Sequence, residues 1–120
     1  MRGYNRMIPG VEGCFRLMEQ YQMLENIKAH SIVVAKVAHL IGRSLLNKGV
    51  ALSLDKVTAG ALLHDIGKTA SLKMGGDHAA MGREICLENE LEDIADIVGE
   101  HVILKNADLN GKYSEKYYIY

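Results

Sequence analysis

The residues LLHDIGKT, at positions 62–69, place a histidine and an aspartate at the end of an apolar segment. An apolar run ends there in His64 and Asp65, and a glycine and a lysine follow. On a helix, Asp65 shares a face with Val57 and Ala61, so its carboxylate is expected in the core. An unpaired buried charge is strongly disfavoured. The sequence therefore predicts that Asp65 has a compensating partner close by.

Length and composition restrict the class of protein. The chain has 120 residues, of which 48% are hydrophobic, so one domain over residues 1–120 with a real core is expected. The net charge of −1 gives no broad basic surface for a nucleic-acid polymer or an anionic membrane. Cys14 and Cys86 match no metal-binding CxxC spacing and are typical of free thiols in a reducing cytoplasm.

Targeting signals are not apparent in the sequence. The N-terminal residues MRGYNRMIPG lack the apolar core of a signal peptide. No run approaches the ~18 apolar residues that a membrane span needs. We therefore expect a cytoplasmic protein without a membrane partner.

Helical patterns run through the chain. Pro9 is the single proline, and no long run of alternating β-branched residues predicts a strand. The expected fold is all-α, a compact bundle of about five to six helices. The predicted helices run from after Pro9 to about Met23 or Leu24, from about Asn26 to Asn47, from a cap at Ser53 through KVTAGALLHDIG, from a cap at Asp77 through HAAMGREICL, and from about Glu90 through LEDIADIVGEHVIL.

The histidines can be placed on these helices by counting about 100° per residue. Four of them, His30, His64, His78 and His101, are predicted to face inward from four different helices. His39, nine residues after His30, is turned to the opposite side and is expected on the surface. The apolar positions that define these faces are Ile27, Val34, Val37, Ile41 and Leu45 with His30, Met81, Gly82 and Ile85 with His78, and Leu91, Ile94 and Val98 with His101.

Inward histidines beside a carboxylate suggest a metal centre. Imidazole and carboxylate are ligands for Zn, Fe, Mn, Co or Ni, and a divalent cation would supply the charge that makes burial of Asp65 tolerable. The alternative is that each histidine has its own hydrogen bond, while Asp65 caps a helix or pairs with Lys68.

At these residues the sequence resembles the HD-domain superfamily of metal-dependent phosphohydrolases, in particular small bacterial proteins with the HDIG motif. The resemblance covers most of the chain, through HSIVVAKVA, ALLHDIGKT, GGDHAAMG and IADIVGEHV. It implies that His30, His64 and Asp65 ligate a metal. His78 and His101 match the positions that hold a second metal in some members, with Asp65 bridging. One or two divalent ions are implied, of Fe, Mn, Ni, Co, Zn or Mg.

The chain departs from the family pattern at its end. HD domains complete the ligand set with an aspartate on a later helix, and this chain ends at Tyr120 without it. Asp108, the only aspartate after His101, comes too early and in a loop-like segment. We therefore expect residues 1–120 to lack the C-terminal helix or helices of the domain.

The chemistry of such a site is metal-activated hydrolysis. Two cations about 3.5–4 Å apart can hold a hydroxide nucleophile and clamp phosphoryl oxygens. Asp65 could help to deprotonate the water, and Lys68 could offer a point charge to a phosphate oxygen or be a solvated lysine at a helix end. Gly67 is expected to end the helix or to let the backbone pass near the site, and Arg83 to be a surface charge.

The resulting prediction is a divalent-metal-dependent phosphohydrolase acting on a small phosphomonoester or phosphodiester such as a nucleotide. Two alternatives are a non-catalytic metal- or nucleotide-binding regulatory module and a structural helical domain without metal. The expected partner is a small phosphorylated substrate, with no nucleic-acid polymer and no membrane. The tyrosine-rich end, KYYIY, makes a homodimer reasonable.

Overall fold

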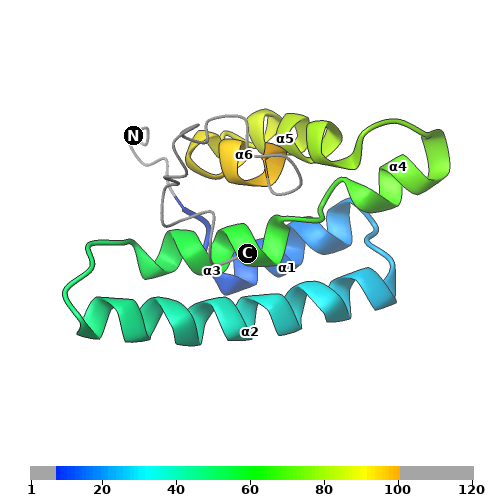
Figure 1. The fold of residues 1–120 in the computed structure, drawn as a ribbon. Coiled ribbons are helices and arrows are strands. Elements are labelled where there is room, and N and C mark those ends of the chain that lie inside the picture. The colour runs from blue at the N-terminus through cyan, green and yellow to red at the C-terminus, as the bar shows by residue number, and fades with distance from the viewer. Residues whose placement is uncertain (1–7, 101–120) are drawn as a thin grey trace, which may run out of the picture.

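The computed structural model describes residues 8–100, which fold into helices joined by turns and loops (Figure 1). The six helices of this part are α1 (Val11–Gln20), α2 (Glu25–Asn47), α3 (Leu54–Leu63), α4 (Lys68–Met74), α5 (His78–Glu88) and α6 (Glu92–Gly99). No strand occurs between residues 8 and 100. The predicted all-α fold is confirmed, whereas the extent of the domain over residues 1–120 stays a prediction.

Helix α3 occupies the middle of the arrangement. It packs against α2, contacts α1, and contacts α6 as well. Figure 1 shows α2 running along α3 on one side, while α5 and α6 pack on each other on the opposite side. Residues 59–63 of α3 are all buried, together with Val57. The C-terminal end of α3, where the HDIG residues follow, is therefore surrounded by other helices.

Two predicted helix caps are confirmed. The Ser53 hydroxyl accepts a hydrogen bond from the Lys56 amide at 3.2 Å, and Asp77 Oδ1 accepts one from the Ala79 amide at 3.1 Å. The first predicted helix was too long, because α1 ends at Gln20. Gln22 has a φ of 55°, in the left-handed region, and a right-handed helix cannot continue through it.

The buried face of α2 differs from the predicted one. Its buried residues are Ile27, Ser31, Ala35, Ala38 and Gly42, whereas Val37 and Ile41 are exposed. Small residues allow α2 to lie close to its neighbours: a Cβ on Gly42 would be 2.8 Å from Leu54 Cδ1. Close packing therefore buries the face of α2 that carries small side chains. Most of the buried residues follow the predicted ones by one position in the sequence.

Several large apolar residues of α2 remain exposed on one face of the helix. Val33, Val37 and Leu40 lie on this face, and a groove of about 490 Å³ beside it is lined by residues that include Phe15 and Leu40. By length and composition, α2 could cross a membrane, contrary to the expectation that no segment could. Core helices of soluble proteins pass the same test, so the absence of a membrane partner stays a prediction.

Both cysteines are free and buried. Burial raises the pKa of Cys14 to about 11 and, with a smaller contribution from Cys14, raises the pKa of Cys86 to about 12. Both side chains are therefore protonated core residues at neutral pH, and they lack the thiolate character of metal-binding or reactive cysteines.

Candidate metal centre

The HDIG residues form a turn between two helices. Helix α3 ends at Leu63, and α4 begins at Lys68, so the prediction of one helix through HDIG was wrong and α4 was missed. Hydrogen bonds from the Ile66 amide to Leu63 O and from the Lys68 amide to Asp65 O, both 2.9 Å, hold the turn. Lys68 consequently starts a helix instead of following the end of one.

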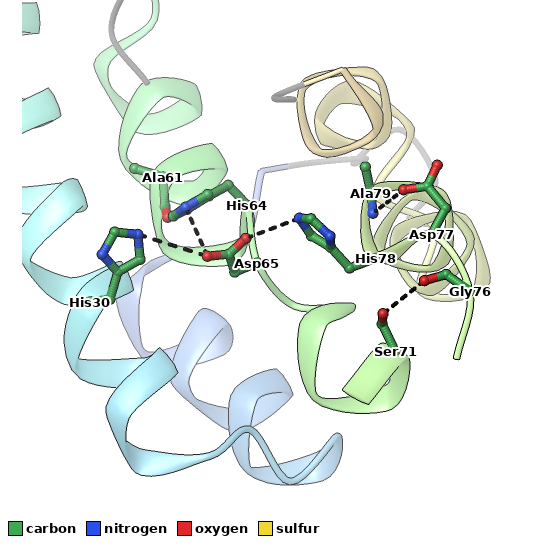
Figure 2. A network of polar contacts seen from close by, with 9 residues as sticks. All are labelled: His30, Ala61, His64, Asp65, Ser71, Gly76, Asp77, His78 and Ala79. Atoms are coloured by element: carbon green, nitrogen blue, oxygen red, sulfur yellow. Dashed lines mark hydrogen bonds and ion pairs between the residues drawn. The ribbon is translucent and has the colours of Figure 1, made fainter. Parts of the chain in front are cut away.

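Asp65 lies at the centre of three histidines (Figure 2). Its Oδ2 is 3.3 Å from His64 Nε2 and 3.8 Å from His30 Nε2, and its Oδ1 is 3.7 Å from His78 Nε2. Figure 2 shows His30, on α2, and His78, on α5, approaching the carboxylate from opposite sides. The two oxygens of Asp65 therefore face different histidines.

The site is buried at its centre and open at one side. The side chains of His64 and Asp65 are 8% and 9% exposed, as predicted for Asp65, whereas that of His30 is 58% exposed. The prediction that His30 points into the core was therefore wrong, although its ring does reach Asp65. His78 is intermediate in exposure. His30 marks the side on which solvent can enter.

His39 was predicted to lie on the surface, and His101 was predicted to belong to this cluster. His39, expected on the surface, is half-buried, and its Nδ1 lies 3.3 Å from Thr58 Oγ1 of α3. His101 lies outside the described residues, as do Asp108 and the tyrosine-rich segment. Their predicted roles stay predictions.

The backbone orients the ring of His64. Its Nδ1 is 2.7 Å from the carbonyl oxygen of Ala61, which can only accept, so Nδ1–H is the donor and Nε2 faces Asp65. Burial lowers the pKa of His64, but hydrogen bonds to Asp65 and Ala61 and the negative charge of Asp65 outweigh it, and the pKa is raised. In the neutral ring, Nε2 carries the lone pair that would bind a cation beside Asp65.

The donor set suits a divalent metal. One ligand atom from each of His30, His64 and Asp65 lies within 4.8 Å of the others, close enough to hold one ion together. Two imidazoles and a carboxylate are common ligands of first-row transition metals. A cation would also compensate the charge of the buried Asp65. The residues therefore fit the metal that the sequence suggested.

A cavity of about 270 Å³ adjoins this group. It is lined by Asn26, Ile27, His30, Asp65, Lys68 and Leu72. Lys68 and Asp65 thus line the same space. Sequence reasoning missed Asn26 and Leu72, although Asn26 lies one turn before His30 on α2. Leu72 lies one turn after Lys68, a relation that becomes visible only once Lys68 is placed in α4.

Gly67 allows α5 to approach the turn. Its φ is −88°, so no left-handed conformation requires glycine here. A Cβ at Gly67 would overlap the carbonyl oxygen of His78 and the amide nitrogen of Gly82. Of the two predicted roles, the structure supports close approach of the backbone, which brings His78 of α5 to Asp65.

Arg83 lies apart from the site. Its side chain is 46% exposed, and its Nε is 3.5 Å from Asp96 Oδ1 of α6. The expectation of a surface charge is confirmed.

The chain belongs to the HD domain family, whose pattern matches residues 27–118. It is similar to ribonuclease Y of Fervidobacterium nodosum, with 36% identity over 78 residues, which are 64% of this chain and 14% of that protein. It is also similar to a tRNA (cytidine(56)-2'-O)-methyltransferase of Thermoplasma volcanium, with 33% identity over 98 residues, 81% of this chain and 27% of that protein.

A further relative is an uncharacterised protein of Methanocaldococcus jannaschii, 30% identical over 79 residues, 66% of this chain and 46% of that protein. The chain therefore matches less than half the length of each of these relatives. No solved structure gave a significant match. The predicted family is confirmed, and the activity of this chain is a separate question.

Proposed function

We propose that the protein is a divalent-metal-dependent phosphohydrolase that acts on a small phosphomonoester or phosphodiester. The observation that carries the proposal is the group of His30, His64 and Asp65, whose ligand atoms lie within 4.8 Å of one another. A cavity beside the group is lined by Asp65, His30 and Lys68. Membership of the HD domain family supports the same chemistry.

His30, His64 and Asp65 would hold the first metal ion. His78, on the Oδ1 side of Asp65, would hold a second ion with His101, and Asp65 would bridge the two. Bound divalent ions supply Lewis-acid chemistry, making water more acidic and polarising a phosphoryl group. Asp65 could take the proton of the attacking water, because its carboxylate borders the cavity.

Lys68 would orient the substrate. Its ammonium group is a point charge that can bind a phosphate oxygen within the cavity. Asn26 and Leu72, on the two sides of the cavity, would contact the remainder of the substrate. The cavity volume of about 270 Å³ suits a phosphate with a small attached group.

RNA is a second candidate substrate. Two relatives carry names of enzymes that act on RNA, a ribonuclease and a tRNA methyltransferase. A short oligoribonucleotide should therefore be tested beside mononucleotides. The predicted preference for a small substrate, the cytoplasmic location and the homodimer remain proposals.

The function is tested by metal-dependent hydrolysis of a generic phosphodiester, bis(p-nitrophenyl) phosphate. Protein treated with chelator should be inactive, and Mn, Fe or Ni should restore turnover. His64→Ala should stay inactive with every metal while its circular dichroism spectrum remains helical. Metal binding without hydrolysis of any substrate tested would instead support the regulatory module, and absence of both would support the structural domain.

Replacing Lys68 by methionine is expected to lower kcat/KM without removing the metal. A hydrogen bond to a charged group contributes about 1.5–3 kcal/mol, which corresponds to a loss of about 10- to 150-fold. Steady-state kinetics with elemental analysis would measure both properties. Lys73→Met is the matched control, because Lys73 is an exposed lysine of the same helix. Equal kinetics in the two variants would remove Lys68 from the site.

A further inference from the structure

We propose that Thr69 is a positioning residue of the metal centre, because its hydroxyl joins the two segments that carry His30 and Asp65. The inference rests on the proposed function and adds a residue to it. Thr69 is not among the residues that line the cavity. It acts through the position of the first turns of α2.

The Thr69 side chain is 1% exposed, and its Oγ1 accepts a hydrogen bond of 3.1 Å from the Leu24 amide. Leu24 is the N-cap of α2, and its backbone is extended, with a φ of −63° and a ψ of 148°. An amide at this position precedes the hydrogen bonds of the helix and needs a partner from elsewhere. Thr69 supplies that partner from 45 residues away in the sequence.

The bond connects the two sides of the cavity. One side consists of Asn26, Ile27 and His30 of α2, and the other of Asp65, Lys68 and Leu72. Leu24 lies two residues before Asn26 on the first side, and Thr69 is next to Lys68 on the second. His30 lies six residues after Leu24, about 9 Å along the helix axis. The hydrogen bond between Thr69 and Leu24 therefore fixes the position of α2 along its axis close to His30.

The position of the His30 ring depends on this hydrogen bond more than the positions of His64 and Asp65 do. Its side chain is 58% exposed, so burial does not hold the ring, and its Nε2 is already 3.8 Å from Asp65 Oδ2. Apolar packing between α2 and α3 is not directional, whereas a hydrogen bond fixes relative position. The ion pairs of Lys28 with Glu19 and Glu25 tie α2 to α1 and to its own first turn, and neither reaches the HDIG residues.

The test compares three variants. Thr69→Val keeps the shape and removes the acceptor, and Thr69→Ser keeps the acceptor and removes a methyl group. Thr58→Val is the matched control, because the Thr58 hydroxyl also joins α3 to α2, through His39, away from the ligands. Affinity for Mn²⁺ is measured by chelator competition, and ligand geometry by the absorption spectrum of the Co²⁺ form.

Thr69→Val is expected to weaken Mn²⁺ binding by about 10- to 100-fold, as the loss of an orienting contact does in other metal sites, and to change the Co²⁺ spectrum. Thr69→Ser should behave like the wild type. Thr58→Val should lower the melting temperature without changing either metal property. A structural role of Thr69 alone would lower the melting temperature and leave the spectrum unchanged.

Unchanged affinity and spectrum in Thr69→Val would overturn the inference and leave the proposed function intact. An equal loss in Thr58→Val would overturn it too, because general loosening of α2 would then be the cause. A wild-type protein that binds no metal would overturn the proposed function first. If Thr69→Val does not fold, Thr69→Ala, which leaves room for a water molecule, is compared with Thr69→Ser by the same criteria.

Discussion

Asp65→Asn is expected to abolish metal binding and hydrolysis together while the helical fold remains. Asp65 is the only acidic residue in the ligand group of the described part of the chain. Its Oδ2 lies near His64 and His30, and its Oδ1 near His78. An amide keeps the shape of the carboxylate, but it loses the charge and one of the two oxygens. The remaining imidazoles bind a metal as neutral ligands, so they supply no negative charge to balance the cation.

Elemental analysis and circular dichroism measure the two halves of this prediction. The metal content should fall from about one or two equivalents to background, and the helical signal should be unchanged. Asp55→Asn is the matched control, because Asp55 is an exposed aspartate in the first turn of α3, the helix that precedes the HDIG turn. Metal retained at the wild-type level by Asp65→Asn would show that this carboxylate is not a ligand.

Helical spacing predicted the burial of Asp65, although Asp65 itself lies in the turn that follows α3. Asp65 follows Val57 and Ala61 at four-residue steps, and all three are buried. The caps at Ser53 and Asp77 were predictable for a similar local reason, since a short polar side chain satisfies amides two or three residues away. Where the contact that determines a structural feature is local, that feature can be predicted from a single sequence.

The position of His30 was not predictable in this way. Counting apolar residues favoured the face of Val37 and Ile41, but packing selected the face of Ala38 and Gly42. That choice depends on how closely α2 can approach α3, which is a property of both helices. Likewise, α4 was missed because the helical pattern of the sequence continues through HDIG, whereas the chain forms a turn there. Thr69 carried no local signal, since its partner is Leu24.

Gly67→Ala is expected to cause the largest loss of stability among single changes at the turn. The added Cβ would overlap backbone atoms of His78 and Gly82, and backbone atoms cannot rotate away as a side chain can. Overpacking typically costs about 1–3 kcal/mol of stability. Because a whole helix must move here, we expect the free energy of unfolding to fall by about 3 kcal/mol or more. Urea denaturation would measure the change in the free energy of unfolding.

The same substitution separates the two proposed metal positions. Moving α5 displaces His78 from Asp65 Oδ1, whereas His30 and His64 come from α2 and from the end of α3, on the Oδ2 side. If the protein binds two metal ions as proposed, Gly67→Ala protein that still folds should therefore lose the ion proposed for His78 and keep the other. Gly10→Ala is the control, since a Cβ there meets nothing within 4 Å. A stability equal to that of Gly10→Ala would show that α5 does not need this close approach, and His78 would then owe its place beside Asp65 to other contacts of α5.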